Sequence, residues 1–319
     1  MPHKVRSSGG PRRLRAGPTL LLAAVGALLS APSLASTDEA ARADAPALVA
    51  PDAISVPMER GLRLEYEGYF GGLHIGSARA VLERRGGEYR VSAEARARGL
   101  LEWFSQWRGR AETRGRLVDA ADVRDFAEPK PDLHRNRGEW RGDPRWSILT
   151  YDADGRVSAQ DGSPPDPNEL TPIPDGSTRD TIDPISAIVA MAEVMQDGGL
   201  CEADLQLFDG RRRYDLTVRD GGVREFAPND YTIFEGEARG CKLEIERIGG
   251  FRIERSKYAE TARDRTVWVG RPIPGGPPVP VRVEIETAYG AAVVHLVGAY
   301  SADQRIALEP GRDVMADND

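Results

Sequence analysis

Residues that could perform chemistry are few in this sequence and lie far apart. Beyond residue 3 the histidines are His74, His134 and His295, each in a different strand-like segment. None belongs to an H-x-x-x-H or H-E-x-x-H pattern, the spacing that presents two metal ligands on one helix face. No serine occupies a G-x-S-x-G elbow, and no glycine-rich loop matches a phosphate cradle. We therefore predict no metal, no cofactor and no catalytic residue, and a nucleophilic triad would have to assemble from distant segments.

The two cysteines, Cys201 and Cys241, are the next candidates for chemistry. They have no C-x-x-C spacing, and no histidine lies near them in the sequence. In an exported chain, an even cysteine count favours a disulfide over free thiols. We predict a Cys201–Cys241 disulfide, which would constrain the unfolded chain by about 4 kcal/mol. A redox-active or nucleophilic thiol is the alternative.

Aromatic side chains form the third group of candidates. The segment LLEWFSQW brings three of them together, and the other tryptophans are spread along the chain. Such side chains can fill the core beneath a curved sheet, and they also commonly line apolar ligand sites. The sharper hypothesis is that they line a groove or cavity for an acyl chain or a partner. The candidate residues are Trp103, Phe104, Trp107, Trp140, Trp146 and Trp268.

The first 35 residues have the order of an export signal. Three arginines between residues 12 and 15 precede the apolar run 20–29, and Ser-Leu-Ala at 33–35 precedes a polar segment. An apolar run of about ten residues is too short for a transmembrane helix, which needs about 20. We expect cleavage near Ala35 and a periplasmic mature chain without a transmembrane segment. Whether export follows the general secretory or the twin-arginine route stays open.

The charge of the chain argues against nucleic acid as a partner. The formal net charge is −7, and removal of residues 1–35, with five basic residues and no acidic one, lowers it to −12. Binding to nucleic acid depends on basic side chains that neutralise phosphates. Residues 36–59, rich in Ala, Pro and Asp, predict a disordered leader. We expect one β-rich domain over residues 60–308 and a flexible tail over 309–319.

Alternation at period two is the dominant pattern within that domain. In YRVSAEARA (89–97) apolar and polar side chains alternate, and CKLEIERI (241–248) and VRVEIET (281–287) follow the same rule. Strands with one buried and one solvent-exposed face have this pattern. Double glycines and Asp-Gly pairs, which suit tight hairpin turns, separate the runs. They are Gly71-Gly72, Gly86-Gly87, Asp154-Gly155, Asp209-Gly210, Gly221-Gly222 and Gly249-Gly250.

These patterns predict an all-β, mainly antiparallel fold: a strongly curved sheet or half-open β-barrel with one packed α-helix at about 183–197. In DPISAIVAMAEVMQDGG, Asp183 can cap the helix, Pro184 suits its first position, and Gly198 can end it. One more helical turn is expected near GLLEWFSQW. The helix should pack on the sheet through one apolar stripe, which consists of Ile185, Ile188, Val189, Ala192 and Met195.

The segment CEADLQLFDGRRRYDLTV, residues 201–218, predicts a hairpin around Asp209-Gly210. Alternating side chains flank the turn, which places Arg211 and Arg212 at or next to the tip. We expect a solvated tip, where water stabilises the charges, and a specific anion site is the alternative. Two proline-rich segments, 161–180 and 270–280, predict long loops, because proline cannot donate ladder hydrogen bonds.

The order of DPISAIVAM, LFDGRRRYDLTV, GCKLEIERIGG and VWVGRPIPGGPPVPVRVEIETAYGAAVVHLVGAY resembles the bacterial exported family of unknown function numbered 3108. The resemblance covers about residues 60–300. It implies a periplasmic all-β domain without an assigned activity, and it brings no catalytic residues to this chain. At the level of fold, the pattern is also similar to periplasmic β-spiral proteins and to open-barrel lipoprotein carriers.

These observations favour a non-enzymatic binding protein for a lipidic or other apolar component of the cell envelope. A sheet that curves over only one helix leaves space to fill, which is the physical basis of this hypothesis. One alternative is a protein–protein interaction module of the envelope. Another is a hydrolase acting on envelope material, which would require a histidine within hydrogen-bond reach of Ser and Asp.

Overall fold

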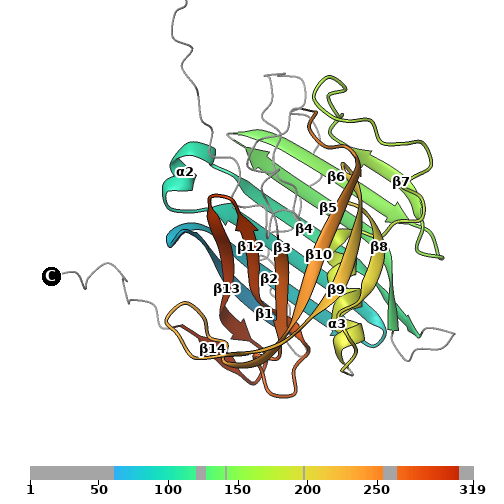
Figure 1. Ribbon diagram of the computed structural model, residues 1–319. Coiled ribbons are helices and arrows are strands. Elements are labelled where there is room, and N and C mark those ends of the chain that lie inside the picture. Colours follow the sequence, from blue (N-terminus) through green and yellow to red (C-terminus); the bar gives the residue numbers. More distant parts are fainter. Residues whose placement is uncertain (1–60, 120–126, 141, 197, 254–263, 309–319) are drawn as a thin grey trace, which may run out of the picture.

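The protein, described here by a computed structural model, is built mainly of β-strands, with two short helices among its described residues (Figure 1). The residues that the structure describes are 61–119, 127–140, 142–196, 198–253 and 264–308.

The predicted export signal (1–35), leader (36–59) and tail (309–319) lie outside the described residues. The bounds of the expected domain, 60–308, therefore stay a prediction. Within the described part of the chain, no helix is both long and apolar enough to cross a membrane.

Fourteen strands form one antiparallel sheet, as the alternation predicted. The strands are β1 (Gly61–Phe70), β2 (Leu73–Arg85), β3 (Glu88–Ala97), β4 (Arg108–Asp119), β5 (Ala127–Trp140), β6 (Asp143–Tyr151), β7 (Val157–Gly162), β8 (Ala203–Phe208), β9 (Arg213–Phe226), β10 (Gly236–Gly249), β11 (Arg265–Gly270), β12 (Val279–Thr287), β13 (Gly290–Tyr300) and β14 (Arg305–Ala307). Their order is β7-β6-β5-β4-β3-β2-β1-β13-β12-β11-β10-β9-β8, and β14 pairs with β13.

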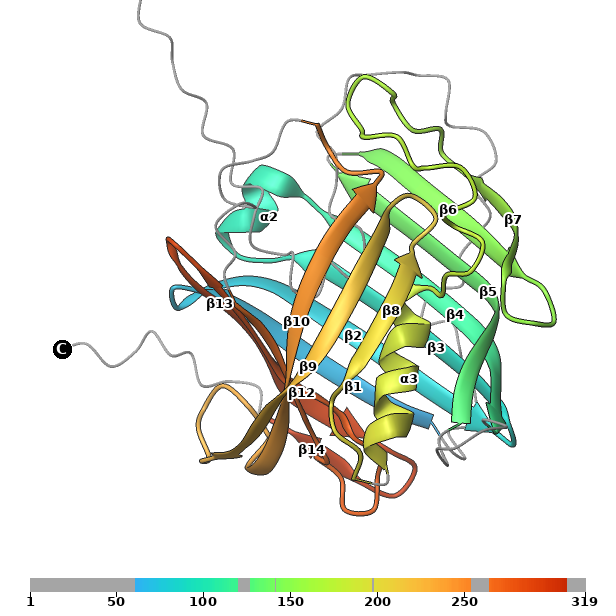
Figure 2. The ribbon, with the colours of Figure 1, turned by 45° about the vertical axis from the view of Figure 1, so that its right-hand side comes forward.

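The sheet curves around α3 (Pro184–Gln196), so that strands from its two halves face each other across the helix (Figure 2). The helix packs on β4 and β5 on one side and on β8 on the other. The sheet stays open, because the described strands end at β7 on one side and at β8 on the other without pairing to each other. This is the strongly curved sheet with one packed helix that the sequence predicted.

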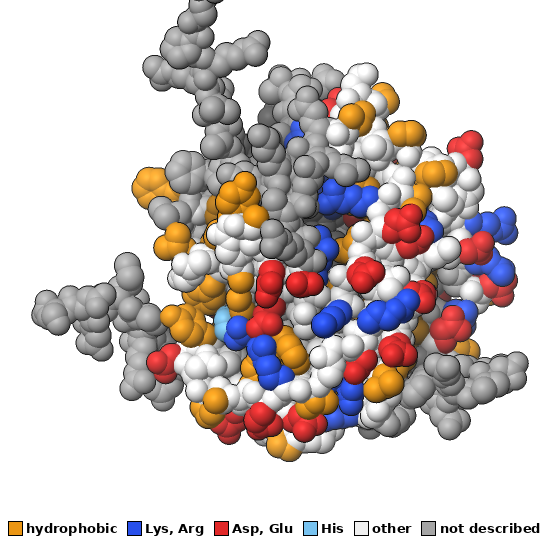
Figure 3. Space-filling model, in the orientation of Figure 1, with side chains coloured by type: hydrophobic (Ala, Val, Ile, Leu, Met, Phe, Trp, Pro, Cys, Tyr) orange, Lys and Arg blue, Asp and Glu red, His pale blue; other side chains and the backbone are white. Residues whose placement is uncertain are grey.

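Strand β3 shows how alternation separates the two faces of the sheet. Tyr89, Ala95 and Ala97 are buried, whereas the intervening arginines reach solvent. On the outer face, charged side chains pair across strands; one example is Glu94 of β3 with Arg110 of β4. Charges of both signs are spread over the face shown in Figure 3. Such mixed pairing suits a solvated sheet surface.

The helix α3 begins directly after the predicted N-terminal cap, Asp183, and ends just before the predicted C-terminal cap, Gly198. Asp183 Oδ1 accepts hydrogen bonds of 3.0 Å from the amides of Ile185 and Ser186, which have no partner inside the helix. At the other end, Gly198 adopts a φ of 81° and its amide bonds the Met195 carbonyl. The expected extra turn is also present, as α2 (Leu100–Ser105).

The predicted disulfide joins Cys201 to Cys241, with the two Cα atoms 5.4 Å apart. Cys201 lies just before β8, and Cys241 lies within β10. The bridge therefore joins the segment that leads into β8 to β10, and β9 pairs with both of these strands. Both cysteines are buried.

Two of the predicted hairpin turns were wrong. β10 ends at Gly249, but β11 begins only at Arg265, so Gly249-Gly250 does not form a tight hairpin. Gly221-Gly222 lies inside β9, which continues to Phe226. Arg239 pairs with Val223 and Cys241 pairs with Asp220, so both glycines stand opposite Gly240 alone. This two-against-one arrangement is a β-bulge, which the positive φ of Gly222, 78°, accommodates. The double glycine bends a strand here instead of reversing it.

The hairpin at Asp209-Gly210 is present, with Phe208 paired to Arg213, but the expected solvated tip was wrong. Asp209 is only 2% exposed. Its carbonyl oxygen accepts hydrogen bonds from Asn136 of β5 and Ser147 of β6, and Gln160 of β7 donates to the Gly210 carbonyl. The tip therefore rests on the opposite end of the sheet.

The arginines beside this tip hold the loop between β7 and α3. Arg211 Nη1 donates to the Ser163 carbonyl at 3.0 Å, and Arg213 Nε donates to the Ser177 carbonyl at 2.8 Å. Burial lowers the pKa of Arg211 to about 10. In the same loop, Ile182 forms a parallel bridge with Leu207 of β8. The loop and the tip thus connect the two edges of the open sheet.

Candidate functional site

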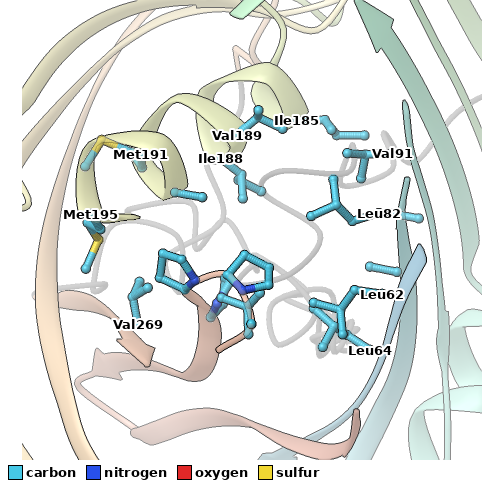
Figure 4. A pocket seen from close by; sticks show the side chains of 18 of the residues that line it. Leu62, Leu64, Leu82, Val91, Ile185, Ile188, Val189, Met191, Met195 and Val269 are labelled. Atoms are coloured by element: carbon cyan, nitrogen blue, oxygen red, sulfur yellow. The ribbon is translucent and has the colours of Figure 1, made fainter. Parts of the chain in front are cut away.

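A cavity of about 750 Å³ lies between α3 and the concave face of the sheet. Its walls come from α3, from β1–β3, from β9–β12, and from the loop between β11 and β12. Figure 4 shows aliphatic and methionine side chains pointing into this space from several directions. The labelled ones are Leu62, Leu64, Leu82, Val91, Ile185, Ile188, Val189, Met191, Met195 and Val269.

The cavity exists because small side chains occupy the inner face of two neighbouring strands. Ala80 of β2 pairs with Ala93 of β3, and Ala78 pairs with Ala95. Ala78, Ala80 and Ala93 line the cavity. A row of larger side chains at these positions would meet α3 directly, as core residues usually do at close packing. The alanines therefore leave unfilled volume beneath the helix.

The helix supplies the wall opposite the alanines. All five residues of its predicted apolar stripe line the cavity. Ile185, Val189 and Met195 are buried, whereas Ile188 and Ala192 are only partly buried. The stripe thus packs on the sheet in part and faces the cavity in part.

Polar side chains gather at one end of the cavity, where α3 ends. Arg84 Nη1 of β2 lies 2.8 Å from Glu193 Oε1 of α3, an ion pair that joins two walls. Nearby, Arg271 Nη2 donates to the Gln196 carbonyl at 2.6 Å, and its Nη1 donates to the Gly276 carbonyl. These contacts attach the last turn of α3 to the strands and loop on either side of it.

The beginning of α3 is held by a buried polar network. Thr113 Oγ1 donates to Asp183 Oδ1 at 2.8 Å, and His134 Nδ1 lies 2.8 Å from the same hydroxyl and 3.2 Å from Asp183 Oδ1. Ser186 Oγ donates to Asp183 Oδ2 at 2.5 Å, and the Tyr89 hydroxyl bonds Ser186 Oγ at 2.8 Å. Tyr89 also lines the cavity, so the network borders that space.

Burial and hydrogen bonding have opposite effects on the pKa of Asp183, the carboxylate of this network. Burial alone would raise the pKa of Asp183, but the charge of His134 and the hydrogen bonds from His134 and Ser186 outweigh it, and the pKa lies below its ordinary value. Burial raises the pKa of Tyr89, and the Asp183 charge adds to that rise. Asp183 is therefore held as a carboxylate that fixes the helix start.

The network brings together Ser, His and Asp, which the hydrolase alternative requires, but not in a catalytic order. A catalytic triad places histidine between the nucleophile and the carboxylate. Here Asp183 lies in the middle, and the Ser186 hydroxyl is hydrogen-bonded to Asp183 and to Tyr89. His134, Asp183 and Ser186 are all buried. This geometry is that of a capped helix and gives no support to hydrolysis.

The other two histidines lie outside this network, on β2 and β13. His74 of β2 contacts Glu67 of β1. His295 of β13 is buried against Tyr69 and Tyr231, and burial together with the nearby Arg282 lowers its pKa to about 4. Among the described residues, no group of His, Cys, Asp and Glu side chains could hold a metal ion.

Four of the six aromatic candidates can be placed, and these four are dispersed over the structure. Trp103 of α2 is 85% exposed, and Trp107 is buried beside α2. Trp146 of β6 is partly buried, and Trp268 of β11 is buried with its Nε1 donating to Glu284. None of these four lines the cavity. The side chains of the remaining two candidates, Phe104 and Trp140, lie outside the described residues.

Sequence reasoning thus missed the residues that form the cavity. The signal was the small size of the inward-facing residues in ARAVLERR and YRVSAEARA, where alanines alternate with charged side chains. Opposite an apolar helix stripe, such alanines cannot fill the space that bulkier strand residues would occupy.

The comparisons with known proteins identify a family without an assigned activity. No curated protein and no solved structure matches the chain. A family model described as "Protein of unknown function (DUF3108)" matches residues 65–297. The match includes most of the cavity lining, the capped helix and the disulfide. The chain therefore belongs to the DUF3108 family.

Proposed function

We propose that the protein binds a lipidic or other apolar molecule in the cavity beneath α3, without catalysing a reaction. The observation that carries this proposal is a space of about 750 Å³ lined almost entirely by apolar side chains. Ligand pockets commonly measure about 300–1,000 Å³ and have mainly apolar walls. Each methylene group buried there would contribute about 0.8 kcal/mol.

Two features support a place in the cell envelope. The order of residues 1–35 is that of an export signal. A buried disulfide suits an oxidising compartment such as the periplasm. We therefore propose that the mature chain is periplasmic and contributes to envelope maintenance by holding an apolar envelope component.

The first test is to identify what the purified protein carries and to measure whether the cavity holds it. Native mass spectrometry before and after solvent extraction should reveal a bound lipid. Binding of the neutral fluorophore N-phenyl-1-naphthylamine should be lost in Ala80→Phe, which fills the cavity. It should persist in Val81→Phe, the matched control, because Val81 is the next residue of β2 and does not line the cavity. Unchanged binding in both variants would refute the proposal.

A second candidate function is docking to another envelope protein. Leu73, Trp103 and Tyr289 are exposed, and hydrophobic side chains gather at the left of Figure 3, near α2 and the neighbouring strand ends. Exposed aromatic residues are common at protein interfaces. Crosslinking in cells that recovers one stable partner, and loss of that product in Trp103→Ser, would support this candidate.

A further inference from the structure

The cavity has one polar end and one apolar end. Arg84 stands at the end of β2, Glu193 and Gln196 lie in the last turns of α3, and Asp303 follows β13; all four line the cavity. These segments lie at the same end, because the start of β1 pairs with the ends of both β2 and β13. A ligand that fits both ends is an amphiphile, with its hydrocarbon inside and its headgroup at the end of α3.

Two further charged residues touch the cavity wall but direct their charges elsewhere. Arg79 pairs with Glu65, and Glu94 pairs with Arg110. These four residues alternate along their strands with the inward-facing ones, so their ion pairs lie on the outer face of the sheet. The charges available to a headgroup are therefore those at the end of α3.

The exposure of the Arg84–Glu193 pair indicates which charge a headgroup must carry. The Arg84 side chain is 49% exposed, whereas that of Glu193 is only 16% exposed. If a headgroup opens the pair, Arg84 can turn into water at small cost, but Glu193 would lose its cation in a partly desolvated place. A positively charged headgroup replaces that cation. An anionic one would leave Glu193 unpaired beside a second negative charge.

Two residues near this ion pair also favour a positively charged headgroup. Asp303 adds a second carboxylate to this end of the cavity. A further cation at this end, Arg271, is engaged by the Gln196 and Gly276 carbonyls and by Gln196 Oε1. Its guanidinium therefore stabilises the C-terminal end of α3, where carbonyl groups lack helical partners.

Resting on the proposed function, we infer that the ligand is an amphiphile whose headgroup carries an ammonium group, and that Glu193 is the residue that receives it. The ammonium group is shared by simple alkylamines and by zwitterionic lipids with ethanolamine or choline headgroups. Glu193 would bind either, because the ammonium takes the place of the Arg84 guanidinium.

The test compares amphiphiles of equal chain length in displacing N-phenyl-1-naphthylamine from the full protein, below their micelle concentrations. The probes are decyltrimethylammonium, decylphosphocholine, decyl maltoside and decyl sulfate. We expect decyltrimethylammonium or decylphosphocholine to bind about fivefold more tightly than decyl maltoside, the size of one partly exposed ion pair. Decyl sulfate should bind most weakly. Which of the two ammonium probes binds better distinguishes an alkylamine from a zwitterionic lipid.

Substitutions of the two residues of the ion pair should change ammonium binding in opposite directions. Glu193→Gln should remove the ammonium preference and leave decyl maltoside binding unchanged, which also reports that the cavity is intact. Arg84→Gln should strengthen ammonium binding, because it removes the competing cation. Glu94→Gln, a matched loss of one carboxylate that points away from the cavity, should change neither.

The outcomes separate this inference from the proposed function. If no probe displaces the fluorophore, or the fluorophore does not bind, the proposed function fails. If all probes displace it equally, or decyl sulfate displaces it best, the cavity binds amphiphiles but the ammonium assignment is wrong. A loss of ammonium binding in Arg84→Gln would also overturn the assignment.

Discussion

Thr113 Oγ1 donates a hydrogen bond of 2.8 Å to Asp183 Oδ1, which joins the middle of β4 to the residue that caps α3. Both side chains are fully buried, so water cannot replace this bond. The same carboxylate accepts the first free amides of the helix. The position of the helical cavity wall therefore depends on a contact between residues 70 positions apart.

Thr113→Val should lower the free energy of unfolding by about 1–3 kcal/mol, because the valine leaves Asp183 and His134 without their shared hydroxyl in a buried place. Urea denaturation followed by tryptophan fluorescence measures this change. The exposed Thr150 of β6 provides the control: Thr150→Val should stay within about 0.5 kcal/mol of the parent protein. Equal small effects would show that the buried bond contributes little.

His295 should make the fold sensitive to mild acid. Its pKa is about 4 in the folded protein, against an ordinary value of 6.5, so the unfolded chain binds the proton more readily between these values. Stability is then complete above about pH 6.5 and falls by roughly 3 kcal/mol as pH drops to about 4. Denaturation curves across this range should show the loss.

His295→Phe should flatten that pH profile, because the buried ring can no longer take up a proton. The control is His74→Gln, since His74 is exposed and lies beside Glu67. That variant should keep the slope of the parent protein. A slope that survives in His295→Phe would assign the acid sensitivity to another group.

The disulfide should make a large contribution to stability. The cysteines are 40 positions apart, and without the disulfide the unfolded chain gains conformational entropy that stabilises it by about 4 kcal/mol. The double variant Cys201→Ala, Cys241→Ala should show this loss in urea denaturation. Ellman titration of the denatured, unreduced parent protein should detect almost no thiol. Two titratable thiols would show that the bridge is absent.

Leucine substitutions at two neighbouring alanines should have opposite consequences. Ala93 of β3 pairs with Ala111 of β4, but only Ala93 lines the cavity, and Ala111 is buried in a packed cluster. Ala111→Leu should cost about 1–3 kcal/mol through overpacking. Ala93→Leu should be neutral or stabilising, because its added carbons enter existing space. Equal destabilisation of both variants, measured by urea denaturation, would mean that the space closes in solution.

Local signals in the sequence were enough to predict much of the fold. Alternation in the segment 89–97 separated the inward-facing apolar residues from the outward-facing polar ones, because a strand has period two whatever its neighbours are. Asp183 and Gly198 marked the helix ends for similarly local reasons, since caps satisfy amides and carbonyls within one turn.

Features that depend on distant strands could not be predicted in this way. The tip at Asp209 is buried because Asn136 and Ser147, more than 60 positions away, provide its partners. The tryptophan hypothesis relied on residue type, whereas the structure distributes Trp103 and Trp107 between solvent and core. The cavity arises where the alanines of β2 and β3 face α3, and this placement depends on the curvature of the whole sheet.

The bridge between Ile182 and Leu207 has a consequence for how copies of this protein meet one another. The Ile182 amide donates to the Gln206 carbonyl, and the Phe208 amide donates to the Ile182 carbonyl, so the outer edge of β8 is already occupied by its own chain. Open sheets with bare edges recruit strands from neighbouring molecules and aggregate. Here a short stretch of loop covers this edge, so strands of neighbouring molecules cannot pair with β8 there. The sheet can therefore remain open around its cavity without polymerising through this edge.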